Sequence, residues 1–336
     1  MQNRLIISLI TAKISFATLT FYFFAVYLGW DMFTYPDYYF AYSNCIEISP
    51  VNVYYSKLLC GLSSVTGKTV AFDSIFFISL AAFINMLILV GYFKVCEKYL
   101  NEYGKYLLII LFATHPYMNI YFFRFYTDLF ASLGVFLIFL YKMRNININI
   151  FFVIFALILM NFRVALIPVF IAYGLWEICY LYIHRNHKKL FYPILLVLLS
   201  LLSYIPVMEF SSTFANINSE ENLLEKVIYN IIFAFGYRES SGISRELIAL
   251  EGWTDIGSFI VSLILIAIHA IGFYGIIKFS LLKKDLSILI VFVYLLIPIL
   301  AVAHMRYLMP LMPILLFGCS YLFYSTAKVE NLSNAD

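Results

Sequence analysis

The sequence predicts an all-α, polytopic integral membrane protein, and three observations lead to that fold class. The chain of 336 residues is 63% hydrophobic and 12% charged, whereas soluble domains are about half apolar and about a quarter charged. Its mean hydropathy is +0.91. Apolar runs of roughly 20 residues, the length that a helix needs to cross a bilayer, recur throughout. We therefore expect one transmembrane domain over residues 1–336, without linkers or internal repeats.

The apolar runs predict about ten transmembrane helices. We interpret the first as a retained span rather than a signal peptide, because its apolar run is too long and no small-x-small cleavage site follows it. Several runs are shorter than 20 residues, which indicates thin or broken helices around a cavity. The expected spans lie near residues 5–29, 69–93, 106–121, 126–141, 147–161, 165–182, 190–208, 257–277, 286–303 and 307–324.

The basic residues predict that both termini are cytoplasmic. With the N-terminus inside, the basic segments alternate without a break, as the positive-inside rule requires. The cytoplasmic segments would then contain Arg4, Lys94, Lys98, Lys105, Lys142, Arg144, Arg185, Lys188, Lys189, Lys278, Lys283, Lys284 and Lys328.

The arginines show the opposite bias to the lysines. Five of the eight arginines fall on the predicted outer side, whereas only three of the fourteen lysines do. Thirteen of the nineteen acidic residues also fall there. Arginine suits bidentate, partly buried contact with phosphate or carboxylate. The charge distribution therefore predicts a functional site at the outer face.

Two long outer loops are expected, at residues 30–68 and 209–256. From Val53 onward the first loop is apolar at every third or fourth position, which predicts an amphipathic helix in the membrane interface. Cys45 and Cys60 both fall on the outer side. A disulfide between them and two unpaired buried thiols both remain open.

Three aspartates are candidate catalytic residues. Asp31 and Asp37 follow the first span in an unusually aromatic loop, where a partly desolvated carboxylate could take a proton from a sugar hydroxyl. The alternative is that they are solvated loop acids. Asp128 lies four residues after Arg124, so on one helix the two would share a face and could pair. That pair would either be functional or simply ease membrane insertion.

The candidate substrate-binding residues are mainly arginines. Arg163 in "MNFRVALIP" and Arg306 in "AHMRYLMPLMP" each lie at a junction where almost no loop separates two predicted spans. At such a junction an arginine would either bind an anionic lipid headgroup or snorkel to the interface. Arg124 is a further candidate. Arg238 and Arg245 are weaker candidates, because they lie in a loop.

Two histidines lie in apolar surroundings. His115 joins the substrate-binding candidates, although an isolated histidine is more often a structural hydrogen-bonding residue, and Pro116 after it should break the helix. His269 lies in the middle of a predicted span, and we expect it to form an interhelical hydrogen bond.

The sequence predicts no obligatory cofactor. It contains no CxxC motif, no metal-type Cys/His cluster, and no Rossmann or P-loop glycine motif, so cytosolic nucleotide chemistry is unsupported. We assign no metal ligands. Any metal would be an oxygen-bound Mg²⁺ or Mn²⁺.

These features resemble the GT-C superfamily of membrane glycosyltransferases, which use polyprenyl-phosphate-linked sugars. The family pattern is an acid in the first outer loop, matched by Asp31 or Asp37, a second acid at the outer end of a later span, matched by Asp128 in "FYTD", and arginines near span ends. "FYTDLFASLGVFL", "NFRVALIP" and "RYLMP" resemble the dolichol-pathway α-1,2-glucosyltransferase branch. That branch has Asp-Glu in its first loop, whereas Met32 follows Asp31 here.

The chain also resembles bacterial O-antigen and exopolysaccharide polymerases, which are rich in Phe, Tyr and Ile and carry arginines in outer loops. The stretch "GWDMFTYPDYYFAY" followed by "SPVNVYYSKLLCGL" is similar to the start of that group. Both resemblances imply a polyprenyl carrier, such as undecaprenyl phosphate, at the outer membrane face.

The predicted function is therefore a glycosyltransferase of cell-envelope polysaccharide assembly, such as lipopolysaccharide biosynthesis, in the bacterial inner membrane. Asp31, or as second choice Asp37, would deprotonate the acceptor, and Asp128 would orient the acceptor or a metal. Arg163 and Arg306, with Arg124, would hold the phosphate. The alternatives are an O-antigen-type polymerase that joins pyrophosphate-linked repeat units and a lipid-linked glycan transporter. The partners expected are lipid-linked glycans and membrane lipid, not nucleic acid.

Overall fold

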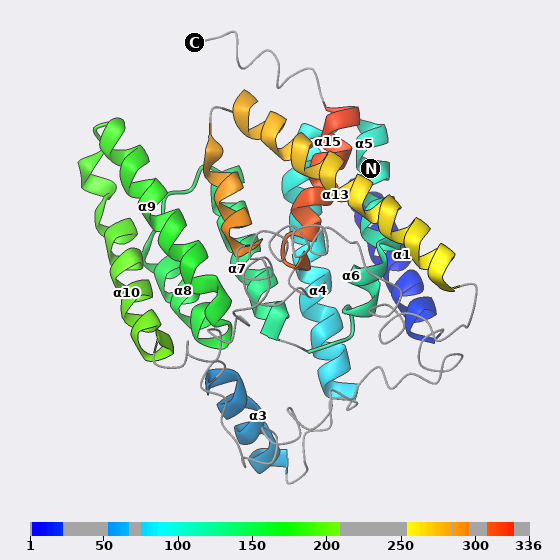
Figure 1. Ribbon diagram of the computed structural model, residues 1–336, viewed down its shortest axis with the longest axis horizontal. Coiled ribbons are helices and arrows are strands. Elements are labelled where there is room, and N and C mark those ends of the chain that lie inside the picture. Colours follow the sequence, from blue (N-terminus) through cyan, green and yellow to red (C-terminus); the bar gives the residue numbers. More distant parts are fainter. Residues whose placement is uncertain are drawn as a thin grey trace, which may run out of the picture.

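The computed structural model describes residues 2–22, 53–66, 75–125, 127–208, 254–283, 285–295 and 308–325 (Figure 1). Every regular element within these ranges is a helix, and the one β contact among them is an isolated bridge between Leu100 and Ser325. The α-helices are α1 (Gln2–Tyr22), α3 (Val53–Thr66), α4 (Ile75–Cys96), α5 (Glu102–Thr114), α6 (Pro116–Ile120), α7 (Thr127–Met143), α8 (Ile150–Phe162), α9 (Ile167–Ile183), α10 (Phe191–Met208), α13 (Thr254–Leu282) and α15 (Met312–Tyr324). The 3₁₀ helices are η2 (Glu97–Tyr99), η3 (Val164–Leu166), η4 (His187–Lys189) and η6 (Leu286–Leu295).

The predicted all-α class is confirmed for the described residues, and a helix overlaps each of the ten predicted ranges. Within the described ranges, four helical segments are long and apolar enough to cross a membrane: Asn3–Tyr22, Ile78–Tyr99, Val164–Ile183 and Leu263–Leu282. This length and composition indicate a membrane protein. The number of spans and the cytoplasmic placement of the termini stay predictions.

Two groups of helices are joined by α7 and η6 (Figure 1). In the first group, α10 packs against α8 and α9. In the second group, α5 packs against α1 and α15, and α13 packs along α15. Between the groups, α7 contacts α4 on one side and α8 on the other, while η6 contacts α9 and α13. The helix α3 lies at one end of the bundle, where it contacts α8.

Local sequence explains where several helices begin and end. The side chains of Asn101 and Asn149 cap α5 and α8 by accepting hydrogen bonds from the backbone N–H groups of Gly104 and Phe152. The helix α5 ends at Thr114 with His115 as its C-cap, because Pro116 cannot continue the α5 hydrogen-bonding pattern. The break predicted within residues 106–121 is therefore confirmed.

Glycines allow α13 and α15 to pack with their backbones in close contact. A Cβ atom added to Gly275 would overlap the carbonyl oxygen of Gly318, and a Cβ atom added to Gly318 would overlap that of Gly272. Small residues permit such close approach between helices in membranes. These glycines therefore set the distance between the two helices.

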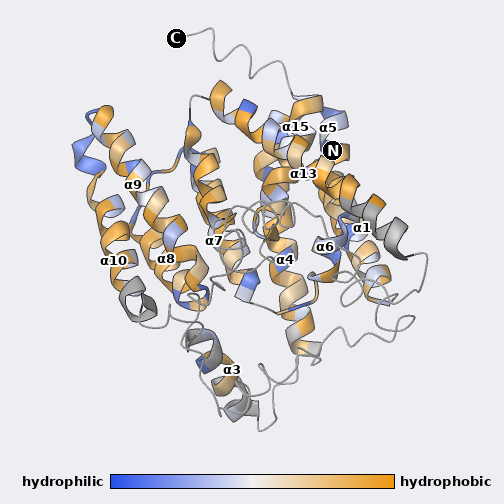
Figure 2. Cartoon of the chain, viewed as in Figure 1, coloured by the Kyte–Doolittle hydropathy of each residue, from blue (hydrophilic) through white to orange (hydrophobic). Residues whose placement is uncertain are grey.

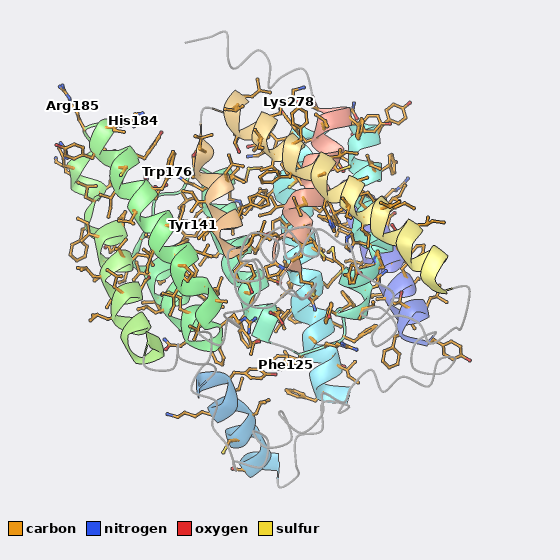
Figure 3. All side chains as sticks on the ribbon, in the orientation of Figure 1. Phe125, Tyr141, Trp176, His184, Arg185 and Lys278 are labelled. Carbon is orange, nitrogen blue, oxygen red and sulfur yellow. The ribbon has the colours of Figure 1, made fainter. Side chains whose placement is uncertain are left out.

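The described helices consist mostly of hydrophobic residues (Figure 2), and many of their large apolar side chains are exposed. Large side chains are exposed on α8, such as Phe151 at 69%, and on α10, such as Leu202 at 60%. Such a surface suits lipid rather than water. The labelled basic residues His184, Arg185 and Lys278 lie toward one end of the bundle in Figure 3, and Phe125 lies toward the opposite end.

Candidate functional site

The structure brings two predicted site residues, Asp128 and Arg163, into a buried ion pair. Arg163 Nη2 lies 3.0 Å from Asp128 Oδ1, and Arg163 Nη1 donates a hydrogen bond of 3.1 Å to Thr127 Oγ1. Asp128 is 3% exposed and Arg163 is 7% exposed. One guanidinium group therefore contacts two adjacent residues of α7 through two different nitrogens.

Backbone structure on both sides places this pair. Arg163 is the extended C-cap of α8, with φ −141° and ψ 97°, and η3 begins at the next residue. Its N–H donates to Leu159 O at 2.9 Å, and its carbonyl accepts from the Leu166 N–H at 3.0 Å. Asp128 lies in the first turn of α7, where a carboxylate is favoured by the positive end of the helix dipole. Arg163 is thus the residue that connects α8 to η3, as the predicted short connection implies, and from this position its side chain reaches α7.

The prediction that Arg124 and Asp128 share one face of a helix is wrong. The helix α7 begins at Thr127, and Arg124 lies before it in a non-helical segment, so the two residues do not share a helical face. The guanidinium of Arg124 lies instead over the ring of Tyr121, 5.3 Å from its centroid. The ion pair that the structure shows for Asp128 is the one with Arg163, which comes from the end of a different helix.

Aromatic side chains surround the start of α7. The rings of Phe130 and Phe162 stack with centroids 4.4 Å apart, and Phe125 meets Phe130 edge to face at 5.9 Å. Tyr55 of α3 donates its hydroxyl hydrogen to Phe125 O at 2.7 Å and contacts the Phe130 ring. The helix predicted from Val53 is confirmed as α3, and its Tyr55 contacts aromatic residues on both sides of the start of α7.

His115 belongs to a different cluster. Its Nδ1 accepts from the Met118 N–H at 3.4 Å, and its Nε2 lies 3.0 Å from His269 Nε2. Because Nδ1 is an acceptor, the neutral His115 ring carries its hydrogen on Nε2 and donates it to His269. The interhelical hydrogen bond predicted for His269 is confirmed. The described contacts of His115 include neither Asp128 nor Arg163, so the structure does not group it with them.

Lys13 is a buried basic residue that is not among the predicted site residues. Its side chain is fully buried in α1, donates to Phe112 O at 3.1 Å and to Asn119 Oδ1, and lies over the Phe122 ring. A lysine within an apolar span is rare and costly. The signal in the sequence is that Lys13 is a charged residue within the predicted span 5–29.

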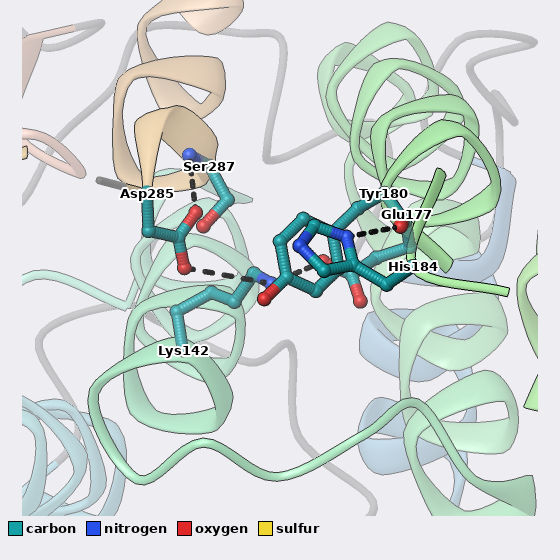
Figure 4. A network of polar contacts seen from close by, with 6 residues as sticks. All are labelled: Lys142, Glu177, Tyr180, His184, Asp285 and Ser287. Atoms are coloured by element: carbon teal, nitrogen blue, oxygen red, sulfur yellow. Dashed lines mark hydrogen bonds and ion pairs between the residues drawn. The ribbon is translucent and has the colours of Figure 1, made fainter. Parts of the chain in front are cut away.

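A second charged network lies at the opposite end of α7 (Figure 4). Lys142 forms an ion pair with Glu177 of α9, and its Nζ lies 3.8 Å from Asp285 Oδ2 at the start of η6. The Ser287 N–H donates to Asp285 Oδ1 at 2.9 Å. The sequence predicts only a topological role for Lys142, and Glu177 is not among the predicted site residues, although an acid inside the predicted span 165–182 is a visible signal.

The remaining predictions are partly outside the described residues. Cys60 is disulfide-bonded, whereas Cys96, Cys179 and Cys319 are free. No group of three or more potential metal-binding residues occurs in the described part of the chain. Six residues singled out from the sequence lie outside the described ranges: Asp31, Asp37, Cys45, Arg238, Arg245 and Arg306.

Comparison of the chain with protein-family models, with curated proteins and with solved structures finds no match.

Proposed function

We propose that this protein is a membrane glycosyltransferase of cell-envelope polysaccharide assembly, which uses a polyprenyl-phosphate-linked sugar at the outer face of the bacterial inner membrane. The observation that carries the proposal is the buried pair of Asp128 and Arg163 at the meeting of two helix ends. Ionisable residues at membrane depth are costly, and they commonly mark substrate sites. The family resemblance of "FYTD" and "NFRVALIP", given above, adds support from sequence.

Arg163 supplies the phosphate-binding group. Its guanidinium has five donors in a planar fork, of which one contacts Asp128 and one contacts Thr127. Such a held guanidinium can stabilise a phosphate without reorienting. Asp128 and Thr127 thus keep Arg163 in place, and Asp128 also orients the acceptor. Arg306 and Arg124 are proposed as further phosphate contacts, with His115, Arg238 and Arg245 as weaker substrate-binding candidates.

The reaction proposed is an inverting sugar transfer. The Asp31 carboxylate, or as second choice that of Asp37, takes the proton from an acceptor hydroxyl. The hydroxyl oxygen attacks the anomeric carbon, and the bond from that carbon to the phosphate oxygen breaks. The lipid phosphate leaves with the electron pair, and Arg163 stabilises its charge. This sequence of steps needs no metal, although Mg²⁺ or Mn²⁺ is compatible with it.

The aromatic residues near Asp128 support a sugar as the ligand. The rings of Phe125, Phe130 and Phe162 lie beside the start of α7, and Tyr55 brings α3 against them. Aromatic faces can pack on sugar rings, and they also suit a membrane interface.

A second candidate is an O-antigen or exopolysaccharide polymerase. The ion pair of Asp128 with Arg163 would serve it equally well, because the pair holds the arginine in place in either enzyme. A polymerase would use the same arginine on a pyrophosphate-linked glycan and would depend less on the aspartates. A lipid-linked glycan transporter is the third candidate.

The test is gene deletion in the native host, with surface polysaccharide analysed on a gel. Complementation lanes carry Asp31→Asn, Arg163→Lys, and Arg185→Gln, an exposed arginine in the turn after α9, as the matched control. Under the proposal the ladder vanishes or every rung loses one sugar, and only Arg185→Gln restores it.

Two other outcomes would replace the proposal. If the ladder collapses to one repeat unit, Asp31→Asn restores it and Arg163→Lys does not, the polymerase is correct. If deletion leaves the polysaccharide unchanged, both enzymatic functions are wrong.

A further inference from the structure

Two lysines from separate segments meet over one tyrosine, Tyr99, and an arginine from a third segment lies close to one of them. Lys98 Nζ lies 4.8 Å from the centroid of the Tyr99 ring, and Lys283 Nζ lies 4.4 Å from the same centroid. Lys283 also donates a hydrogen bond of 2.6 Å to the Tyr99 hydroxyl. Arg144 follows α7 directly, beside Met143, whose carbonyl accepts from Lys98 Nζ at 3.1 Å. We call Lys98, Arg144 and Lys283 the basic triad.

The surrounding core fixes Tyr99 and therefore the geometry of the triad. Tyr99 is 8% exposed. Its ring meets Phe279 edge to face at 5.1 Å and contacts Phe317 at 6.4 Å. Lys98 and Arg144 are exposed, and Lys283 is partly buried. Because Tyr99 is held in place by the core while Lys98 and Arg144 are exposed, an anion could reach these cations from outside the protein.

The charges of the triad are not balanced among themselves. Arg144 repels Lys98, and Lys98 repels Lys283. Burial, and then repulsion from Lys98, lower the pKa of Lys283 to about 8, while Asp285 acts in the opposite direction. Asp285 also lies near Lys142. Holding like charges together costs free energy, and a bound anion would offset that cost.

We propose that Lys98, Arg144 and Lys283 form a binding site for a phosphate group, supplied by the headgroup of an anionic lipid. Arginine and lysine together are the side chains that recognise phosphate. Basic pockets between transmembrane helices bind anionic headgroups. The triad connects η2, the end of α7 and the end of α13, and so lies at the end of α7 opposite Asp128. The proposal uses none of the residues of the proposed glycosyltransferase site.

The experiment measures lipid binding to the purified full-length chain by native mass spectrometry, with phosphatidylglycerol as the probe and phosphatidylcholine as the neutral comparison. The test variant is Lys98→Gln/Arg144→Gln/Lys283→Gln. The control variant is Arg185→Gln/Lys188→Gln/Lys189→Gln, which removes the same charge from three exposed residues. A second arm titrates inorganic phosphate against bound phosphatidylglycerol. Melting temperatures establish that both variants are folded.

We expect the test variant to bind phosphatidylglycerol about tenfold or more weakly than the wild type and the control variant. If inorganic phosphate at millimolar concentration displaces the lipid, the site recognises phosphate from either source. If it does not, the site is specific for the lipid headgroup. Equal weakening in both variants would show non-specific attraction to basic surface. Equal binding in the wild type and the test variant would also overturn the proposal. Because glycosyl transfer is not measured here, this outcome is independent of the proposed function.

Discussion

Asp128 at the start of α7 and Arg163 at the end of α8 form an ion pair of 3.0 Å in a buried setting. The same guanidinium reaches Thr127, so one arginine ties the beginning of α7 to the joint between α8 and α9. Lys142 and Glu177 make a comparable connection at the other end of α7. Charged contacts at its two ends thus attach α7 to the helices α8 and α9.

Removing one partner of the Asp128–Arg163 pair should destabilise the protein strongly. Arg163→Leu leaves the buried Asp128 carboxylate without its arginine, which typically costs about 3–5 kcal/mol. Asp128→Leu/Arg163→Leu should recover most of the lost melting temperature in detergent but none of the polysaccharide synthesis. Recovery of synthesis in the double variant would show that the pair is only structural.

The contact between α13 and α15 should not tolerate a methyl group. Gly275→Ala and Gly318→Ala place a Cβ atom against a facing carbonyl, and we expect each to cost about 1–3 kcal/mol of stability. The matched control is Gly61→Ala on α3, where a Cβ atom meets nothing within 4 Å. Thermal unfolding of the three variants checks this. A Gly318→Ala variant as stable as Gly61→Ala would contradict the packing.

The Lys142–Glu177 pair should show strong coupling. Lys142→Met leaves a buried carboxylate near Asp285, whereas Lys142→Met/Glu177→Gln removes both charges of the pair. We expect the single variant to lose about 3–5 kcal/mol and the double variant to lose clearly less. Melting temperatures of the wild type, both single variants and the double variant form the cycle. Additive losses would mean that the two side chains do not interact.

Stability should rise with pH because of Lys283. Its pKa is lowered from 10.5 to about 8, chiefly by burial. Between these two values the unfolded state binds more protons than the folded state, so the free energy of unfolding increases as the pH rises. The slope should be smaller in Lys283→Met than in the wild type when thermal unfolding is measured from pH 8 to pH 10. Identical slopes would mean that Lys283 keeps an ordinary pKa.

The local features of this protein were readable from its sequence. Apolar composition determined the membrane class, and Pro116 determined the end of α5, because both effects act within a few residues. The apolar spacing after Val53 determined the helix α3. The tight joint at Arg163 was also visible, since no loop separates the two apolar runs.

The partners of the charged residues were decided by the tertiary structure. Local spacing suggested a shared helical face for Arg124 and Asp128, but α7 begins at Thr127, and the packing of α7 against α8 brings Arg163 to Asp128. The packing of α9 and η6 likewise brings Glu177 and Asp285 to Lys142. A sequence determines which charges lie in an apolar setting, since that depends on neighbours along the chain. Which opposite charge each one meets depends on how helices cross, and only the folded structure sets that.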